Sequence, residues 1–526
     1  MFAITLLASL AVGANAYIWP SPQLDALESI RYDQDGHRSQ GISVFLEPCD
    51  LFIFSASPSG RADSADWIRT AYHDMATHNV ADGSGGLDAS IRFLEEQSRP
   101  ENAGDGFGNT ITVFLAHANR YVSIADVIAL GAIMAVENCG GPEIAFRGGR
   151  VDAGEPNLPG VPEPQQDLQS HIDSFARQGF TPTEMIGLVA CGHTFGGVQH
   201  DTFPDIVPDL HDPGNLKSVA HFDTTFSHFD NNVATEYISG TTQNPLVVGA
   251  NDTTNSDKRI FSSDGNATML SFANSPELFA STCADLLARM VDTVPRGVQL
   301  TEVIKPLLVK PAAVQLILDG SNLQFSGEVR FWNKTADPNR SVSLQWDDNV
   351  GGTHNVSTQA SGVSSAVAGR FTAAWYAFNS TLDAVAGITS MRFLVDGKVE
   401  DQNGVGFAVQ DGILYSKTSC LQSQNPLTGR LDVAVRNGLN PTHVFLEQEV
   451  RDSVNRPVVV SIEVPRPAQA LAANDAYSLW SITVADNNVG VGSSPATAFT
   501  ITAEVGGVNI TANGGQFLAT LPACTT

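Results

Sequence analysis

The change of pattern near residues 292–300 constrains the fold of this chain more than any other feature. Upstream, helix-start signals built from Ser, Thr, Pro and acidic residues occur at 123–126, 181–184 and 275–276. Each of these signals precedes an apolar stretch. Downstream, short β-branched runs such as 341–346 alternate with Gly, Asn, Asp and Pro. The sequence therefore predicts a mainly α-helical unit followed by an all-β unit.

The length of 526 residues exceeds that of one ordinary domain. We expect a leader at 1–16, a helical domain at 17–299, and two β-sandwich-like domains at 300–405 and 406–526. The β region has the length of two immunoglobulin-like sandwiches. One large sandwich fits that length as well, and no internal repeat decides between the two arrangements.

Residues 1–16 have the composition of a secretory signal. An apolar stretch from Ile4 to Val12 is followed by Ala14-Asn15-Ala16, a small-x-small cleavage motif. A buried N-terminal helix is the alternative. No later stretch reaches the ~18–20 apolar residues of a membrane span, and the last residues lack the hydrophobic tail of a lipid-anchor signal. We therefore expect a soluble protein that is secreted to the extracellular space.

Charge and modification signals agree with secretion. The net charge of −27 opposes binding to nucleic acid and to anionic membranes. The six cysteines form an even set, as disulfides outside the cell require. Seven Asn-x-Ser/Thr sequons make the chain a candidate glycoprotein: Asn251, Asn266, Asn333, Asn339, Asn355, Asn379 and Asn509.

Two histidine-bearing segments carry the chemistry. Arg69 and His73 lie four residues apart, on one face of a helix expected from Ala65 to Asn79. They suit the splitting of a peroxide, which needs a base to move a proton and a cation to stabilise charge on the O–O bond. His193 ends a second predicted helix, where a lone histidine suits an axial iron ligand. Each residue alone has an ordinary structural use, and only their coincidence points to chemistry.

The combined pattern resembles the haem peroxidases of the plant, fungal and bacterial superfamily across roughly residues 45–300, and secreted fungal members most of all. The resemblance implies a two-lobed helical bundle around haem b, followed here by an all-β extension that the resemblance does not cover. It also implies that the enzyme reduces hydrogen peroxide and oxidises electron donors through a ferryl intermediate.

On the distal side of the haem, the resemblance makes His73 the acid–base group and Arg69 the cation. Tyr72 stands where relatives have Phe or Trp over the haem. A neutral histidine must be held in one tautomer. Asn102, preceded six residues earlier by Glu96, matches the asparagine that does this in the family.

On the proximal side, the resemblance makes His193 the iron ligand. Its other nitrogen should meet a carboxylate, which makes the ligand more electron-rich. In relatives this aspartate follows Ser or Thr before a helix, so Ser263-Asp264 makes Asp264 the expected partner. Phe222 stands where the intracellular class has Trp, so no tryptophan radical is expected at this position.

Two further patterns resemble the calcium sites of secreted fungal members, which bind two Ca²⁺ through hard oxygen ligands. The distal set is Asp74, Gly86, Asp88 and Ser90. The proximal set is Thr194, Asp223, Thr225, His228 through its carbonyl, and Asp230. Potassium is an alternative at the proximal site.

The resemblance also supports a disulfide between Cys49 and Cys139. A pair between Cys420 and Cys524 could close the last β domain, which would leave Cys191 with Cys283.

Specialised donor sites of fungal relatives do not match. The surface tryptophan of lignin peroxidase corresponds here to Leu188, and the three carboxylates of manganese peroxidase correspond to Arg61, Ala65 and Gln199. We therefore expect a peroxidase that oxidises small phenols or similar donors at the haem edge.

Two alternatives from other classes stay open. The β region could bind glycan or cell-wall polysaccharide and tether the enzyme, or the protein could bind haem without turnover. Exposed aromatic residues would favour the first alternative, although core burial is the ordinary fate of such residues; the candidates are Trp332, Trp346, Trp375 and Trp480.

Overall fold

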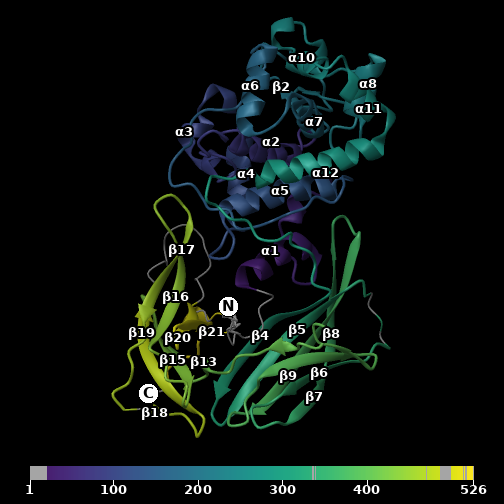
Figure 1. The fold of residues 1–526 in the computed structure, drawn as a ribbon. Coiled ribbons are helices and arrows are strands. Elements are labelled where there is room, and N and C mark those ends of the chain that lie inside the picture. Colours follow the sequence, from purple (N-terminus) through teal and green to yellow (C-terminus); the bar gives the residue numbers. More distant parts are fainter. Residues whose placement is uncertain are drawn as a thin grey trace, which may run out of the picture.

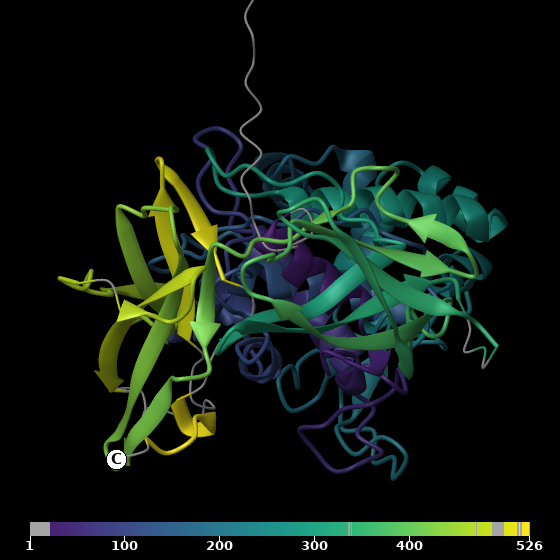
Figure 2. The same cartoon turned by 90° about the horizontal axis from the view of Figure 1, so that it is seen from below.

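The computed structural model describes residues 21–334, 337, 339–469, 471–485, 499–512, 515 and 518–524. A helical unit occupies one end of the molecule, and two β units lie side by side at the other end (Figure 1). Seen from below, both β units lie under the helices (Figure 2). The predicted leader at 1–16 falls outside the described residues. None of the described helices combines the length and the apolar character that a membrane crossing requires.

The helical unit is built as the capping signals predict. Ser123 caps α5, Thr181 and Glu184 form a capping box at α7, and Ser275 caps α12. Each cap accepts a hydrogen bond from a backbone N–H that has no partner inside its helix. The helices are α1 Pro22–Tyr32, α2 Asp63–Met75, α3 Leu94–Gln97, α4 Gly106–Phe114, α5 Ile124–Asn138, α6 Leu168–Gln178, α7 Pro182–Gly192, α8 Asn232–Ser239, α9 Pro245–Val248, α10 Ser256–Phe261, α11 Ala267–Asn274 and α12 Pro276–Asp292.

The core of this unit lies around α5, all of whose residues are buried. α2 packs against α5 and α4, and α7 packs against α12. α2 ends at Met75, whereas the sequence analysis expected this helix to continue to Asn79. Arg177 accounts for this end, because its guanidinium donates to the carbonyls of Ala76, at 2.7 Å, and Thr77, at 3.2 Å. A side chain therefore satisfies carbonyls that a further helical turn would otherwise use.

The β region contains long antiparallel strands with alternating burial, as the sequence predicts. The strands of the first unit are β4 Val309–Asp319, β5 Asn322–Trp332, β6 Val342–Asp347, β7 Thr353–Ser357, β8 Gln359–Ala366, β9 Phe371–Asp383, β10 Ser390–Val395, β11 Lys398–Glu400 and β12 Phe407–Ala408. Those of the second are β13 Ile413–Ser416, β14 Cys420–Gln424, β15 Leu427–Arg436, β16 His443–Arg451, β17 Pro457–Glu463, β18 Leu471–Ala472, β19 Tyr477–Ala485, β20 Phe499–Val505 and β21 Val508–Thr511.

One large sheet runs through both β units. Its order is β1-β8-β9-β5-β4-β13-β15-β19-β18, in which β1 is the short strand Asp35–Gly36, and the two units join where β4 pairs in parallel with β13. A smaller sheet, β11-β10-β6-β7, is joined by β12 and belongs to the first unit, and a second, β17-β16-β20-β21, belongs to the other. Two sandwiches therefore share a sheet, which combines the two arrangements that the sequence left open. Because β12 pairs with β10, the first unit continues past the predicted division at 405/406.

The N-terminal arm joins the helical unit to the first β unit. β1, Asp35–Gly36, pairs with β8, and α1 lies against the sheet. Arg330 of β5 is fully buried and donates to Glu28, and also to Asp33 at 2.6 Å. On the other side of α1, Arg31 pairs with Glu137 of α5 at 2.9 Å. Such buried pairs hold the two units in one orientation, because losing either partner would leave a buried charge.

The structure contains the three disulfides that the sequence analysis considered. Cys49 is bonded to Cys139, Cys191 to Cys283 and Cys420 to Cys524, so none of the six cysteines is free. The last bond ties the end of the chain to β14. All four candidate tryptophans of the β region are buried, with at most 6% of their surface exposed.

Candidate active site

Arg69 and His73 lie on α2 and line a cavity of about 320 Å³. The Nη2 atom of Arg69 donates to the carbonyl of Ala103 at 3.0 Å, and its guanidinium lies 4.4 Å from the centre of the Phe107 ring. The same ring lies 4.8 Å from that of His73. Phe107, which the sequence analysis did not single out, thus packs against both polar side chains.

Asn102 fixes the tautomer of His73. Its Oδ1 atom lies 2.7 Å from Nδ1 of His73, and its Nδ2 atom donates to the carbonyl of Glu96 at 2.8 Å. Because the carbonyl of Glu96 can only accept, Oδ1 of Asn102 faces the imidazole and Nδ1 carries the proton. The Nε2 lone pair is therefore free to act as a base. Asn102 thus contacts Glu96, the residue six positions earlier that the sequence analysis paired with it.

Burial and the neighbouring Arg69 cation hold the pKa of His73 well below its ordinary value of 6.5, although Asn102 acts in the opposite direction. Burial also lowers the pKa of Arg69 to about 10, which leaves its guanidinium charged at neutral pH. The pair thus consists of a neutral base beside a cation.

His193 faces the same cavity from the C-terminal end of α7. Its ring stacks on Phe222, with centres 4.0 Å apart and planes 11° apart. Its Nδ1 atom lies 2.8 Å from Oδ2 of Asp257, which also accepts from Nδ2 of Asn244 at 2.8 Å. Because the carboxylate accepts the Nδ1 proton, the Nε2 lone pair of His193 is available to a metal.

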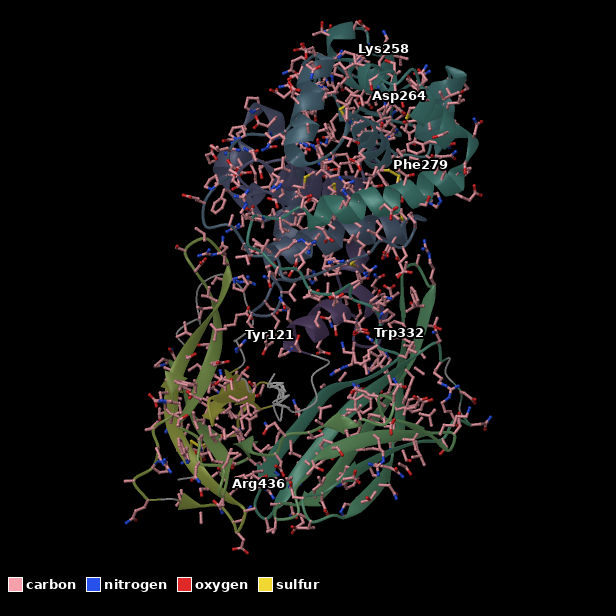
Figure 3. The ribbon with its side chains drawn as sticks, in the orientation of Figure 1. Tyr121, Lys258, Asp264, Phe279, Trp332 and Arg436 are labelled. Atoms are coloured by element: carbon pink, nitrogen blue, oxygen red, sulfur yellow. A yellow bond between two sulfur atoms is a disulfide. The ribbon has the colours of Figure 1, made fainter. Side chains whose placement is uncertain are left out.

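The predicted role of Asp264 is therefore wrong, and Asp257 takes its place. Asp264 instead accepts from the backbone N–H and the hydroxyl of Thr268, at 3.0 and 2.6 Å, in the first turn of α11. The sequence holds two Ser-Asp pairs at helix starts, seven residues apart, and Ser256-Asp257 opens α10. Figure 3 labels Asp264 within the helical unit. The motif alone could not separate the two pairs, because only packing decides which helix start faces His193.

The cavity between the two histidines suits a planar, largely apolar cofactor. Its walls come from α2, α6, α7, α10 and α12, and besides Arg69, His73 and His193 they include apolar residues such as Ile68, Phe175, Leu188 and Met290. Tyr72 also lines the cavity and stacks on Phe175, with ring centres 6.0 Å apart. An axial nitrogen on one side and an acid–base pair on the other are the donors that a haem site requires.

The predicted distal cation ligands gather beside α2. Asp74 accepts through Oδ2 from the backbone N–H groups of Asp88 and Ala89, at 2.9 and 2.7 Å. Asn157, which the sequence analysis missed, places Nδ2 3.0 Å from both carboxylate oxygens of Asp88 and from Oγ of Ser90. Rotating this amide would bring its oxygen into the set, which suits a hard cation. Gly86 lies nearby and donates its N–H to Thr77 at 3.1 Å.

The predicted proximal cation ligands also lie together. Thr225 donates to Asp230 at 3.0 Å, Thr194 donates to the Asp230 carbonyl at 2.8 Å, and the N–H of His228 donates to the Thr225 carbonyl at 2.7 Å. Oδ2 of Asp223 is buried without a hydrogen-bond partner. Burial, with further repulsion from Asp230, raises the pKa of Asp223 to about 7. An orphaned carboxylate oxygen beside a second carboxylate fits a cation.

Neither set forms a metal centre made of side chains alone. Within the described parts of the chain, no group of three or more His, Cys, Asp or Glu side chains is arranged to hold a metal. Both sets depend instead on hydroxyl and carbonyl oxygens, and the two Ca²⁺ ions remain a proposal.

None of the three positions equivalent to the manganese ligands is a carboxylate, and one of them is a cation. Arg61 pairs with Asp66 and Asp105, at 2.7 and 2.8 Å, while Ala65 and Gln199 line the cavity wall. A guanidinium in that place repels a divalent metal. Leu188 is buried and lines the cavity, so no surface aromatic replaces it there.

Comparison with known proteins identifies the class. Residues 53–275 match the family described as Peroxidase, and they include both histidines and the residues around them. This part of the chain is thus a peroxidase-family domain, of the haem-peroxidase type.

Among its relatives, a WSC domain-containing protein of Arthroderma benhamiae is 40% identical over 341 residues, which is 64% of this chain and 46% of that protein. L-ascorbate peroxidase 5, peroxisomal, of Arabidopsis thaliana is 31% identical over 33% of this chain and 58% of its own length. Mitochondrial cytochrome c peroxidase of Candida albicans is 33% identical over 24% of this chain and 36% of its own length. The chain spans less than two thirds of the length of each of these relatives.

The Arthroderma match extends beyond the peroxidase domain. Its 341 residues exceed the stretch upstream of β4, which begins at Val309, so part of the β region is included. The match to the plant ascorbate peroxidase is much shorter, at 175 residues.

Proposed function

We propose that the protein is a secreted haem peroxidase that reduces hydrogen peroxide and oxidises small phenolic or similar one-electron donors. The observation that carries this proposal is the pairing of two fixed histidines across one cavity. Asn102 holds His73 as a neutral base beside Arg69, and Asp257 holds His193 as an electron-rich ligand. A haem-binding protein without turnover would need only the second of these arrangements.

Haem bound to Nε2 of His193 would supply the iron that holds peroxide and takes up its oxidising equivalents. The chain's own residues would do the rest. Nε2 of His73 accepts a proton from the peroxide oxygen that it faces and returns it to the departing oxygen. The Arg69 guanidinium stabilises the negative charge that develops on the departing oxygen. Phe107 and the other apolar residues limit water around both groups.

Donor choice rests on the lining residues of the cavity that are also partly exposed to solvent. Pro100, Glu101, Pro162, Glu163 and Gln199 all contribute to its lining. Small donors that approach these residues would meet carboxylates and apolar ring surfaces. With Arg61 and Leu188 at the positions discussed above, specialised oxidation of manganese or lignin is not part of the proposal.

Secretion is supported by the three disulfides and by the seven sequons, all of whose asparagines are exposed. Contact of the 300–526 region with polysaccharide stays a prediction. Its four tryptophans are buried, so they do not provide the exposed aromatic residues that would favour such contact. The name of the Arthroderma relative includes a WSC domain. An insoluble-polysaccharide pull-down of the full chain tests whether this protein binds such polymers.

The proposal is tested by mixing the haem-loaded protein with one equivalent of hydrogen peroxide in a stopped-flow spectrometer. We expect a rapid loss of Soret absorbance that is reversed by a phenolic donor. His73→Leu should slow the first step by ~10²–10⁴-fold, since that is the usual contribution of a positioned acid–base group. A wild-type spectrum that ignores peroxide, or a His73→Leu protein that reacts as fast as the wild type, would refute the proposal.

A further inference from the structure

A hairpin of the second β unit reaches the helical unit. β16 and β17 rise from their sandwich to the lower edge of the helices (Figure 1). Figure 3 labels Tyr121 at this junction. Arg451, at the end of β16, donates to the carbonyls of Leu115 and Ala118, at 3.2 and 2.6 Å, just after α4. Glu449 accepts the backbone N–H of Arg120 at 2.7 Å, and Arg120 also pairs with Glu447.

The tip of this hairpin also contacts the distal side of the active site, through Arg92. The Nε atom of Arg92 donates to the carbonyl of Val454 at 3.2 Å, and its Nη1 atom donates to the carbonyl of Ala89 at 2.6 Å. Its Nη2 atom donates to the carbonyl of Ala153. One guanidinium therefore joins three segments that lie far apart in the sequence, as the fixed fork of an arginine allows.

The hairpin presents the Val454 carbonyl from a turn that is itself fixed. Oδ1 of Asp452 accepts the backbone N–H groups of Val454 and Arg456, each at 2.9 Å. Oδ2 of Asp452 pairs with Nε of Arg456 at 2.7 Å. An aspartate that bonds two turn amides and a side chain holds the turn in one conformation.

Arg92 also bonds the 88–91 loop, and this loop contacts the residue that follows the distal histidine. The amides of Asp88, Ala89 and Ile91 all donate to the carboxylate of Asp74, at 2.9, 2.7 and 2.9 Å. Asp74 is buried and directly follows His73 on α2. The carbonyl of Ala89 that Arg92 holds thus belongs to the same loop whose amides hold Asp74.

We propose that Arg92 is a positioning residue through which the β16–β17 hairpin fixes the 88–91 loop, and with it Asp74 and His73. The β extension is then part of the distal architecture of the peroxidase domain as well as an appended unit. The consequence for the peroxide reaction rests on the proposed function, but the hold on the loop does not.

Arg92→Lys tests the fork directly, with Arg120→Ala as a matched control. Lysine keeps the positive charge near Asp74 and Asp88 but cannot reach three carbonyls from one ammonium group. The described hydrogen bonds of the Arg120 side chain go to the same hairpin and to none of residues 88–91. Hydrogen–deuterium exchange of the full-length chain, followed by mass spectrometry, reports on the 88–91 amides without any need for turnover.

We expect Arg92→Lys to speed exchange of the 88–91 amides about tenfold, and Arg120→Ala to leave it unchanged. Asp452→Ala changes only the turn of the hairpin and should act in the same direction, by about threefold. This variant keeps the test informative if Arg92 variants fold poorly. Exchange in Arg92→Lys and Asp452→Ala that equals the wild type, or an equal rise in Arg120→Ala, would overturn the proposal.

Stopped-flow measurements separate this proposal from the proposed function. In the haem-loaded protein, Arg92→Lys should slow the reaction with peroxide about fivefold, and Arg120→Ala should keep the wild-type rate. If Arg92→Lys speeds exchange at 88–91 yet reacts with peroxide at the wild-type rate, the link from the loop to His73 is refuted. If the wild type itself ignores peroxide while the exchange pattern holds, the proposed function fails and the hold of the hairpin on the loop stands.

Discussion

The replacement of Asp257 by asparagine isolates the charge of the proximal carboxylate. Oδ2 of Asp257 accepts both from Nδ1 of His193 and from Nδ2 of Asn244, each at 2.8 Å. An asparagine oxygen in the same place can accept both hydrogen bonds, so the geometry is kept and only the negative charge is lost. Asp257 is 1% exposed, and solvent does not replace the missing charge.

The magnitude follows from the distance between this charge and the metal-binding nitrogen. Nε2 of the imidazole lies about 2 Å beyond Nδ1, and therefore roughly 5 Å from the carboxylate. A cation bound to Nε2 would lie about 2 Å farther out, roughly 7 Å from the carboxylate. At an effective dielectric constant of about 20, that separation corresponds to about 2.4 kcal/mol. This energy corresponds to about a fiftyfold change in the affinity of Nε2 for a cation, which agrees with the ~10–100-fold losses seen when the partner of a metal-bound histidine is removed.

Transfer of haem from the loaded protein to an excess of a haem-scavenging protein measures this loss as a dissociation rate. We expect Asp257→Asn to release haem ~10–100-fold faster than the wild type. Asp264→Asn is the matched control, because Asp264 bonds only within the first turn of α11 and should leave the rate unchanged. A fast release in Asp264→Asn together with a wild-type rate in Asp257→Asn would refute the assignment and the electrostatic reasoning behind it.

Three further predictions follow from buried charges. Burial and Arg69 depress the pKa of His73, so the base stays neutral in mild acid. The rate of reaction with peroxide should therefore decline only well below pH 6.5. A decline centred at or above pH 6.5 would contradict this prediction. Chelation of Ca²⁺ should loosen both sides of the cavity and alter the haem spectrum, and it should be faster at low pH, because protons compete with the cation for its carboxylate ligands; an unchanged spectrum and activity after complete metal removal would refute the cation sites. Arg330→Met should destabilise the protein by ~3–5 kcal/mol in urea unfolding, since Asp33 would stay buried without its partner and Glu28 would keep only Lys310; a loss below about 1 kcal/mol would contradict that account.

The sequence predicted the features that depend on local chemistry. Capping residues such as Ser123 and Thr181 act within one turn, so the starts of α5 and α7 could be placed before any packing was known. Arg69 and His73 share a helix face at a spacing of four residues, which puts them in one cavity. The change from helical to β pattern also required only local periodicity.

Contacts between distant segments needed the tertiary structure. Ser256-Asp257 and Ser263-Asp264 are equivalent as motifs, and only the packing of α10 against α6 and α7 brings Asp257 to His193. The shared sheet is a second case, because a parallel pairing of β4 with β13 leaves no signal in either strand.

By itself, the sequence determined the class of the helical unit, the two histidines and the presence of a β extension. Only the tertiary structure decided which carboxylate holds His193, that Asn157 joins the distal oxygen set, and that Arg92 ties Val454 to the active-site loop. The physical reason is the range of the interactions involved. Capping and periodicity act over a few neighbouring residues, whereas a hydrogen bond across hundreds of residues depends on how all the intervening segments pack.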